Sequence, residues 1–388
     1  MDHDTIEHWL QTKAREMPNM PEFAEQFRLQ LLAAGLDFAR FSLSYQTLHP
    51  EVAALAFFWN DTEERIQQYD VSLEIKMSSD YLVSPVRIIH EGGDMVRCRL
   101  EGDDPDLEYE FLEGLRDTGY TDYLMLGVPM SGTRRAPLMV ATKRPGGFTD
   151  DEIAGLKAIR GMLGLHIEIH ASHHLAGSLL DVYLGHGTGE RVLAGAIRRG
   201  SVQKIPAALF FCDLRNFTAL SERLPRNFIV HVLNDYFGEV GRAVDDNRGE
   251  ILKFIGDAAL AIFPVEGEDV TGACDRALAA AHALTANLET LNTVRANDGK
   301  PPLIAGMGLH AGDVWYGNIG AAGRMDFTVI GPAVNRAARL EKLASDLGEA
   351  VMVSEDFAAS SSADFERVGA FELKGIEGMT PAFRPRAD

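Results

Sequence analysis

The feature that most constrains the fold is the segment GEILKFIGDAALAIFP, Gly249–Pro264. Two short apolar runs flank a glycine–aspartate pair, a pattern typical of two antiparallel strands joined by a tight turn. Lys253 interrupts the first run, and Asp257 follows Gly256 at the tip. Charged side chains are almost never fully buried without a partner, so packing alone does not explain these two charges.

The residues around this hairpin alternate between strand-like and helix-like patterns. PAALFFCD, which ends at Asp213, is typical of an apolar strand that precedes a loop and a helix. An alanine-rich amphipathic helix follows the hairpin over residues 270–297, and Pro332 stands at the start of another helix. LIAGMGLHAGDVWYGNIG, MDFTVIG and the segments near the end of the chain are typical of strands. The alternation predicts an α/β (α+β) fold for residues 202–388.

The first half of the chain has a different pattern. The 388 residues allow two or three domains of roughly 150 residues each. Residues 1–40 carry helical periodicity, residues 41–140 contain short strand-like runs, and a helix is expected after Thr149 as its N-cap. This helix–sheet–helix order resembles a GAF-like α/β sensor domain, which we place at residues 1–165. Residues 166–201 are expected to form a helical and Gly-rich linker.

The charge balance limits the partners. Acidic residues outnumber basic ones by 57 to 37, which gives a net charge of −20. Nucleic acid and anionic membranes both need a basic patch to displace counterions, so neither is an expected partner. A nucleotide remains possible, because a divalent cation can bridge carboxylates and a polyphosphate.

The lack of recognisable targeting signals and the scattered cysteines predict a cytoplasmic protein. Apolar runs such as VAALAFFW are far shorter than the ~18–20 residues that a membrane span requires. The start of the sequence, MDHDTIEHW, is acidic and polar, unlike a signal peptide. Cys98, Cys212 and Cys274 are scattered without pair spacing, so we expect neither disulfides nor a zinc site.

Asp213 and Asp257 each follow an apolar strand abruptly. Taken singly, either could be a solvated strand end, and Asp213 could cap the next helix. Taken together, two carboxylates at the ends of neighbouring strands can hold one or two divalent cations against a triphosphate. The loop LRNFT after Asp213 leads into a helix, whose first N–H groups favour phosphate.

A second group of candidates lies in GPAVNRAARLEKL. Asn335 and Arg339 are four residues apart and so share one helix face, among the small residues Ala337 and Ala338. The face could be an ordinary solvated one, with an arginine–glutamate pair. With small neighbours there is also room for a ligand beside the arginine, which could stabilise charge on a phosphoryl group. Thr328 lies just upstream, in a strand that points to the same region.

Four ordered motifs in residues 202–388 together resemble the class III nucleotidyl cyclase catalytic domain. They are FFCDLRNFT, GEILKFIGDAALAIF, GLHAGDVWYGNIG and DFTVIGPAVNRAARLE. The resemblance implies a ferredoxin-like, palm-type domain with a βαββαβ core. Diguanylate cyclases share the palm-like fold but are excluded, because the sequence has no GG[DE]EF turn.

The resemblance implies roles at the matching positions. Two Mg²⁺ or Mn²⁺ ions per site would be held by Asp213 and Asp257, with the Leu214 carbonyl. The phosphate contacts would be Phe217, Thr218 and Lys374, and the base contacts would be Lys253 and Thr328. Asn335 would orient the ribose, and Arg339 would stabilise the pentavalent phosphorus. An arginine that some members carry in the strand before GLH is replaced here by Gly306. This departure from the family pattern concerns one phosphate contact.

The choice of base follows from donors and acceptors. Adenine offers an acceptor at N1 and a donor at N6, which suit the Lys253 ammonium and the Thr328 hydroxyl. Guanine reverses these groups and would call for an acid at position 253. We therefore expect an adenylate cyclase that converts ATP to cyclic AMP. The alternatives are a catalytically silent nucleotide-binding signalling module and a guanylate cyclase.

The resemblance also implies a homodimer with shared sites. In such a dimer, Asp213 and Asp257 of one chain would face Lys253, Thr328, Asn335 and Arg339 of the other. Lys253 and Asp257 would then serve two different sites and would not pair. An unknown small ligand at the N-terminal domain would regulate the enzyme.

Overall fold

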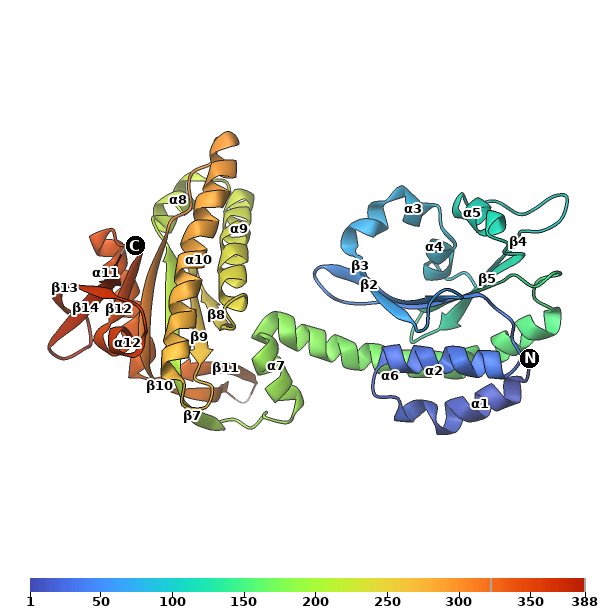
Figure 1. Ribbon diagram of the computed structural model, residues 1–388, viewed down its shortest axis with the longest axis horizontal. Helices are drawn as coiled ribbons and strands as arrows, with labels where there is room; N and C mark the ends of the chain where they lie inside the picture. Colours follow the sequence, from blue (N-terminus) through green and yellow to red (C-terminus); the bar gives the residue numbers. More distant parts are fainter. Residues whose placement is uncertain (322, 387–388) are drawn as a thin grey trace. The chain divides into compact units, whose positions relative to one another are not determined.

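The protein divides into two compact units, Met1–Leu179 and Leu180–Asp388 (Figure 1). The computed structural model describes residues 1–321 and 323–386, apart from the side chains of residues 186 and 226. No helix within these ranges is long and apolar enough to cross a membrane. Cys98, Cys212 and Cys274 are each buried as free thiols.

The first unit is built on a six-stranded antiparallel sheet of order β3-β2-β1-β6-β5-β4. Its strands are β1 (Arg40–Gln46), β2 (Val52–Asn60), β3 (Gln67–Ser72), β4 (Met95–Arg99), β5 (Asp122–Pro129) and β6 (Arg135–Thr142). Its helices are α1 (His3–Thr12), η1 (Ala14–Glu16), α2 (Met20–Ala33), η2 (Leu73–Met77), α3 (Ser79–Leu82), α4 (Pro85–His90), α5 (Phe111–Asp117) and α6 (Asp150–Leu184).

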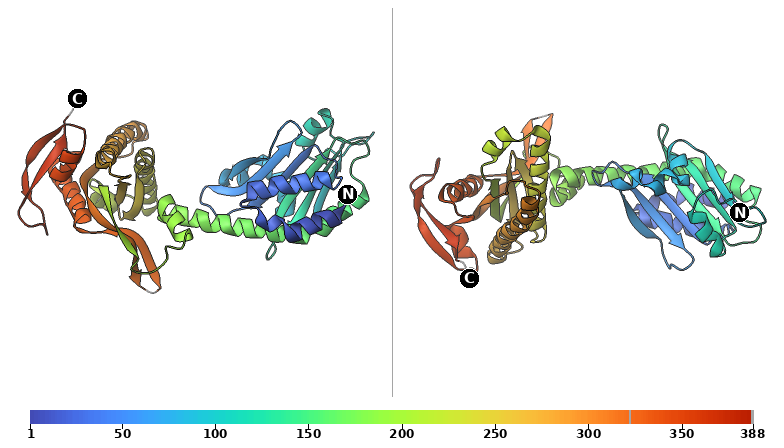
Figure 2. Two further views of the ribbon diagram at one scale, coloured as in Figure 1. Left: turned by 60° about the horizontal axis from the view of Figure 1, so that its bottom comes forward. Right: turned by 90° about the horizontal axis from the view of Figure 1, so that it is seen from above.

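Both faces of this sheet are covered (Figures 1 and 2). Leu124, Leu126 and Val128 of β5 pack with α1, α2 and the first part of α6. Tyr123 and Met125, which alternate with them, pack with α4 and α5 on the opposite face. The period of two along a strand therefore explains why nearly the whole of β5 is apolar.

Short helices lie between the strands of the first unit, where the sequence pattern predicted only strands. The segments η2, α3, α4 and α5 have seven residues or fewer. Such lengths are too short for helical periodicity to show, although Ser78 and Ser84 accept N-cap hydrogen bonds and Pro85 begins α4.

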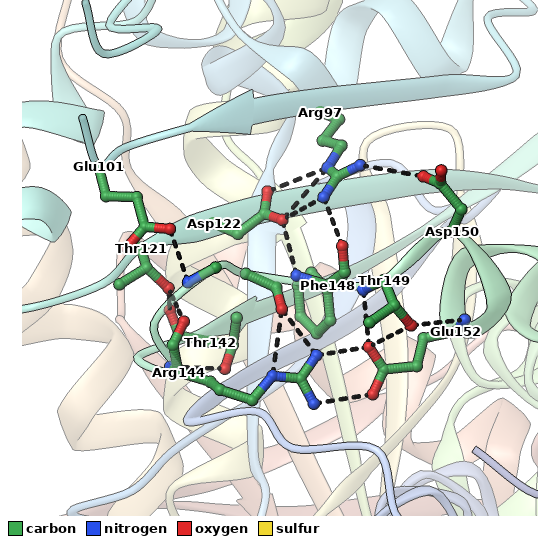
Figure 3. A network of polar contacts seen from close by, with 12 residues as sticks. Arg97, Glu101, Thr121, Asp122, Thr142, Arg144, Phe148, Thr149, Asp150 and Glu152 are labelled. Atoms are coloured by element: carbon green, nitrogen blue, oxygen red, sulfur yellow. Dashed lines mark hydrogen bonds and ion pairs between the residues drawn. The ribbon is translucent and has the colours of Figure 1, made fainter. Parts of the chain in front are cut away.

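The start of α6 carries a polar network (Figure 3). Thr149 and Glu152 form a reciprocal capping box: the Thr149 N–H donates to Glu152 Oε2 at 2.8 Å and the Glu152 N–H donates to Thr149 Oγ1 at 3.2 Å. Arg144 donates two hydrogen bonds to the Glu152 carboxylate. Beside them, Arg97 pairs with the fully buried Asp122 at 2.7 Å. The N-cap expected at Thr149 is therefore confirmed, within a larger network.

Replacing Glu152 with glutamine should destabilise the first unit in a pH-dependent way. Burial alone would raise the pKa of Glu152, but hydrogen bonds from Arg144 and Thr149 outweigh burial and lower the pKa to about 2. An acid whose pKa is lowered by folding stabilises the fold above its unfolded pKa near 4.3, and this stabilisation is lost as the pH falls toward 2. We expect a loss of about 2–3 kcal/mol at pH 7 that shrinks markedly by about pH 3.

Thermal unfolding of the wild type and E152Q at both pH values measures this effect. The control is D151N, which neutralises an exposed acid in the same helical turn. An equal loss of stability for E152Q at both pH values would contradict the electrostatic explanation.

The second unit contains one sheet of order β13-β14-β12-β10-β7-β9-β8, with β11 also paired to β10. Its strands are β7 (Val202–Leu214), β8 (Glu250–Ile255), β9 (Ala258–Pro264), β10 (Ala305–Ala321), β11 (Arg324–Ile330), β12 (Val351–Ser354), β13 (Phe365–Glu372) and β14 (Met379–Pro385). Its helices are α7 (His186–Leu193), α8 (Phe217–Arg223), α9 (Arg226–Asp245), α10 (Val270–Asn297), α11 (Pro332–Leu347) and α12 (Glu355–Ser360).

The predicted βαββαβ core is present as β7–α9–β8–β9–α10–β10, and β8 and β9 form the predicted hairpin. Gly256 in its turn has a φ of +67°, a conformation that glycine adopts at no steric cost. Strand β7 alternates between two cores: Phe210 and Cys212 pack among the helices α9 and α10, whereas Leu209 packs with β11 and α11. The two cores fix β7 in the middle of the sheet and so determine where Asp213 emerges.

Candidate active site

The structure brings Asp213 and Asp257 together. Asp213 lies near the end of β7, and Asp257 lies in the turn between β8 and β9, the strand that pairs with β7. Burial, followed by a hydrogen bond with Asp213 and its charge, raises the pKa of Asp257 to about 6. Two carboxylates so close repel each other when both are ionised.

This carboxylate pair fits a divalent cation. An ion bound between the two groups would relieve their repulsion, and oxygen donors are those that Mg²⁺ prefers. No set of three or more His, Cys, Asp or Glu side chains in the described ranges has the spacing of a complete metal site. Mg²⁺ commonly binds through one or two carboxylates together with substrate phosphates and water, so two acids are sufficient for such a site.

A third acid, Glu341, lies beside the pair and was not predicted from the sequence. Its side chain is buried on α11, and burial followed by the charge of Asp213 raises the pKa of Glu341 to about 7. The sequence does contain a pattern that could have identified Glu341, because the buried face of α11 repeats at Ala337, Leu340 and Ala344. An acid on that face is unusual enough to mark a site.

Helix α11 lies very close to β10 at two glycines. A Cβ atom at Gly308 would overlap the carbonyl oxygen of Ala337 and the backbone nitrogen of Glu341. A Cβ atom at Gly306, which lies opposite Asp213 in the sheet, would lie 3.1 Å from Glu341 Oε1. The glycine at position 306, where some family members carry arginine, therefore leaves space for α11 to lie close to the carboxylates.

Lys253 pairs with Asp326 of β11, not with Asp257. Lys253 lies within β8, whereas Asp257 lies in the turn after the strand ends at Ile255. Thr328 lies two residues beyond Asp326 in β11, so the two side chains share a strand face. Lys253 and Thr328 are thus brought to one region, with Asp326 as a third member that sequence reasoning missed.

The residues of α11 face a separate cavity of about 940 Å³, lined by Asn335, Arg336, Gly331 and residues 375–377. Arg339 Nε donates to the backbone carbonyl of Lys374 at 3.1 Å. The segment after β13 therefore lies against α11, which places Asn335, Arg339 and Lys374 near one another. The Lys374 side chain is exposed.

Phe217 and Thr218 form the first turn of α8, immediately after Asn216, whose φ of +59° is left-handed. The first N–H groups of a helix have no acceptor within it and can bind anions. The Leu214 N–H donates to Asp213 Oδ1 at 3.0 Å, and the Leu214 side chain is buried among the helices. This places the loop LRNFT directly beside the carboxylate pair.

His310 of β10 packs in the core of the second unit. It is buried, and its Nδ1 lies 2.7 Å from the Ser354 hydroxyl, which caps α12. Burial, followed by the charge of Arg336, lowers the pKa of His310 to about 4. A neutral, fully packed histidine is the expected result for a core residue.

Known proteins resemble the second unit in sequence. Residues 201–383 match the family described as the adenylate and guanylate cyclase catalytic domain. The chain is similar to "Adenylate cyclase" of Anabaena cylindrica, with 36% identity over 163 residues, 41% of this chain and 31% of the relative. It is also similar to "Adenylate cyclase 1" of Rhizobium meliloti (strain 1021), with 30% identity over 167 residues, 42% of this chain and 25% of the relative. The chain therefore spans less than a third of the length of these curated relatives.

A solved structure described as a bacterial light-regulated adenylyl cyclase has a TM-score of 0.50 at 23% identity, over 70% of this chain and 87% of that chain. This likeness concerns the fold. Together with the family match, it agrees with the mixed α+β architecture of the second unit. Residues 201–383 are thus similar to adenylate and guanylate cyclase catalytic domains, both in sequence and in fold.

Proposed function

We propose that this protein is an adenylate cyclase that converts ATP to 3′,5′-cyclic AMP and diphosphate. The observation that carries the proposal is the contact between the Asp213 and Asp257 carboxylates, with the pKa of Asp257 raised to about 6 by burial and by Asp213. Such a pair destabilises the metal-free site and favours a divalent cation. The reaction needs this cation more than it needs covalent help from the protein.

Each site residue has a proposed task. Asp213 and Asp257, with the Leu214 carbonyl, hold two Mg²⁺ or Mn²⁺ ions, which when bound lower the pKa of the ribose 3′-hydroxyl and neutralise phosphate charge. Phe217 and Thr218 bind phosphate through their N–H groups, and Lys374 binds the terminal phosphates. Asn335 orients the ribose so that the 3′-oxygen can attack in line. Arg339 stabilises the charge that develops at the α-phosphate.

The preference for ATP over GTP rests on Lys253 and Thr328. The Lys253 ammonium donates to adenine N1, and the Thr328 hydroxyl accepts from N6. Asp326 holds the Lys253 side chain beside Thr328, which supports the assignment. A guanine base would present a donor to the ammonium.

Two copies of the chain are proposed to form the working enzyme. Lys253 and Asp257 lie apart on one hairpin, so one nucleotide is more easily reached by the lysine of one chain and the aspartates of another. Large apolar side chains are exposed on β8, β10 and β11 around Lys253 and Thr328, namely Phe254, Ile255, Trp315, Met325 and Ile330. Exposed apolar surface of this kind is typical of an interface.

The N-terminal part is proposed to regulate the cyclase. We assign residues 1–165 to a GAF-like sensor domain, residues 166–201 to a linker and residues 202–388 to the catalytic domain. The support is a separate compact unit with helices packed on both faces of its antiparallel sheet. Its ligand is an unidentified small molecule.

The decisive experiment is nucleotide turnover by the purified full-length protein. ATP and GTP are each incubated with Mn²⁺, and the products are separated by chromatography. We expect cyclic AMP from ATP and far less cyclic GMP from GTP. Binding of ATP without any product would identify a silent signalling module, and cyclic GMP as the main product would identify a guanylate cyclase.

Exchanging the base contacts should reduce the use of ATP. In Lys253→Glu with Thr328→Cys, the donor to adenine N1 is replaced by an acceptor, so we expect ATP turnover to fall on the order of 10²-fold. Steady-state kinetics with ATP and GTP measure the change. The control is Lys300→Glu, which inverts the charge of a half-buried lysine whose only ion pair in the described contacts is with Asp298. Unchanged ATP turnover in the double variant would remove the base-recognition roles.

A further inference from the structure

A buried polar cluster joins helix α7 of the linker to the cyclase sheet. Thr188 of α7 is fully buried, and its hydroxyl donates to Glu250 Oε1 at 2.7 Å. The Tyr316 hydroxyl lies 3.1 Å from Thr188 Oγ1 and 3.1 Å from both Glu250 oxygens. One carboxylate of β8 is therefore held by hydroxyl groups from α7 and β10.

In this cluster the hydroxyl groups of Thr188 and Tyr316 both donate hydrogen bonds to the Glu250 carboxylate. Tyr316 is 2% exposed, and burial raises its pKa to about 12, so its hydroxyl keeps its proton. Gly187 precedes Thr188, and a Cβ atom there would lie 3.1 Å from Glu250 Oε2. The glycine lets α7 approach the carboxylate closely.

Further contacts hold the linker against β10. The Arg191 guanidinium lies 4.7 Å from the centre of the Tyr316 ring, at cation–π distance. The Asn318 side-chain amide donates to the carbonyl of Ala196, and the Gly200 N–H donates to the carbonyl of Asn318 at 2.9 Å. The contacts extend from α7 to the start of β7.

The same cluster adjoins the residues assigned to the base. Glu250 lies three residues before Lys253 in β8. The Tyr316 ring packs edge-on against Phe327 with centroids 4.8 Å apart, and Phe327 stands between Asp326 and Thr328. A cavity of about 880 Å³ is lined by linker residues 181–185 and 187, by residues 248–254 at and before the start of β8, and by Asp326. The linker thus shares a cavity with Lys253 and Asp326, and Tyr316 packs against the strand that carries Thr328.

We propose that Thr188, Glu250 and Tyr316 are positioning residues, through which the linker sets Lys253, Asp326 and Thr328 for recognition of the nucleotide base. The inference rests on the proposed function, because it concerns the nucleotide site of that same enzyme. A linker that loses its hold on Glu250 frees β8 at the strand that carries Lys253. The base is then bound less tightly and discriminated less well.

The experiment compares variants that differ by single groups in the full-length protein. Thr188→Val removes the hydroxyl and keeps the shape, Thr188→Ser keeps the hydroxyl, and Tyr316→Phe removes the other donor. Thr293→Val is the control, because Thr293 is exposed on α10 and its hydroxyl donates only within its own helix. Thermal unfolding establishes that each variant is folded.

Two measurements are made with Mn²⁺ present. One is KM and kcat for ATP and for GTP. The other is the affinity for 3′-deoxy-ATP and 3′-deoxy-GTP by calorimetric titration, since these nucleotides lack the attacking hydroxyl and report binding even if no product forms. For T188V and Y316F we expect KM for ATP and the dissociation constant of 3′-deoxy-ATP to rise roughly tenfold, which is about 1.4 kcal/mol. The ATP-to-GTP preference should fall, while T188S and T293V stay within about twofold of the wild type.

The outcomes distinguish the proposed cyclase activity from the positioning role of Thr188, Glu250 and Tyr316. No cyclic nucleotide from the wild type contradicts the proposed function, and the titrations with the deoxynucleotides then decide the positioning role by themselves. Unchanged affinity and base preference in folded T188V and Y316F overturn the positioning role, even when the wild type is an active cyclase. An equal loss in T188V and T188S also overturns it, because the hydroxyl would not be the group that acts.

Discussion

Replacing Asp257 with asparagine should reduce cyclic AMP formation roughly 10³-fold, or about 4 kcal/mol of transition-state stabilisation. The change removes one of the two carboxylates that are proposed to hold the metal ions, and keeps the size of the side chain. Because burial and Asp213 raise the pKa of Asp257 to about 6, removing its charge should also raise the melting temperature of the metal-free protein. Turnover with Mn²⁺ and thermal unfolding with and without Mn²⁺ measure both effects.

The control for this variant is Asp298→Asn. Asp298 is exposed and pairs with Lys300, and such surface pairs contribute little to stability. We expect wild-type turnover from D298N. Retention of full activity by D257N, or a Mn²⁺-dependent rise in its melting temperature equal to that of the wild type, would contradict the role of Asp257 as a metal ligand.

Mixing two inactive variants should restore activity. Asp257→Ala lacks a metal ligand and Lys253→Ala lacks a base contact, so a homodimer of either has two defective sites. In a heterodimer, one site carries both defects and the other carries neither. If chains exchange at random, half of the dimers are heterodimers with one intact site of two, which predicts about a quarter of wild-type activity.

This mixture is measured by turnover after joint refolding or co-expression with two affinity tags. Heterodimers isolated through both tags should reach about half of wild-type activity per dimer. A mixture of Asp257→Ala with Asp213→Ala is the matched control, since both defects lie in the same half of the site and cannot complement. Inactive doubly tagged heterodimers of D257A and K253A would refute the shared site.

The elements with strong local signals were predicted from the sequence. The helix expected over residues 270–297 is α10, and the turn expected at Gly256–Asp257 joins β8 to β9. Helical periodicity, capping residues and turn glycines act within a few residues, so a single sequence carries them. The proximity of Asp213 and Asp257 was expected because each follows an apolar strand abruptly.

The missing parts of the site depend on contacts between distant segments. Lys253 meets Asp326 across 73 positions, and Thr188 meets Glu250 across 62. Nothing local in either segment specifies the partner. Glu341 is different, because its place on the apolar face of α11 can be read from the local helical pattern. An acid that breaks an apolar helix face should therefore be examined as a possible site residue.

The close packing of α11 on β10 has a consequence for how this domain can change over time. At Gly308 there is no room for even a methyl group between the strand and the helix. A substitution there would push away the helix that carries Asn335 and Arg339, while every reactive side chain remained in the sequence. The positions of Asn335 and Arg339 thus depend on the absence of a Cβ atom at Gly308. A variant of Gly308 could lose activity although it keeps every reactive residue.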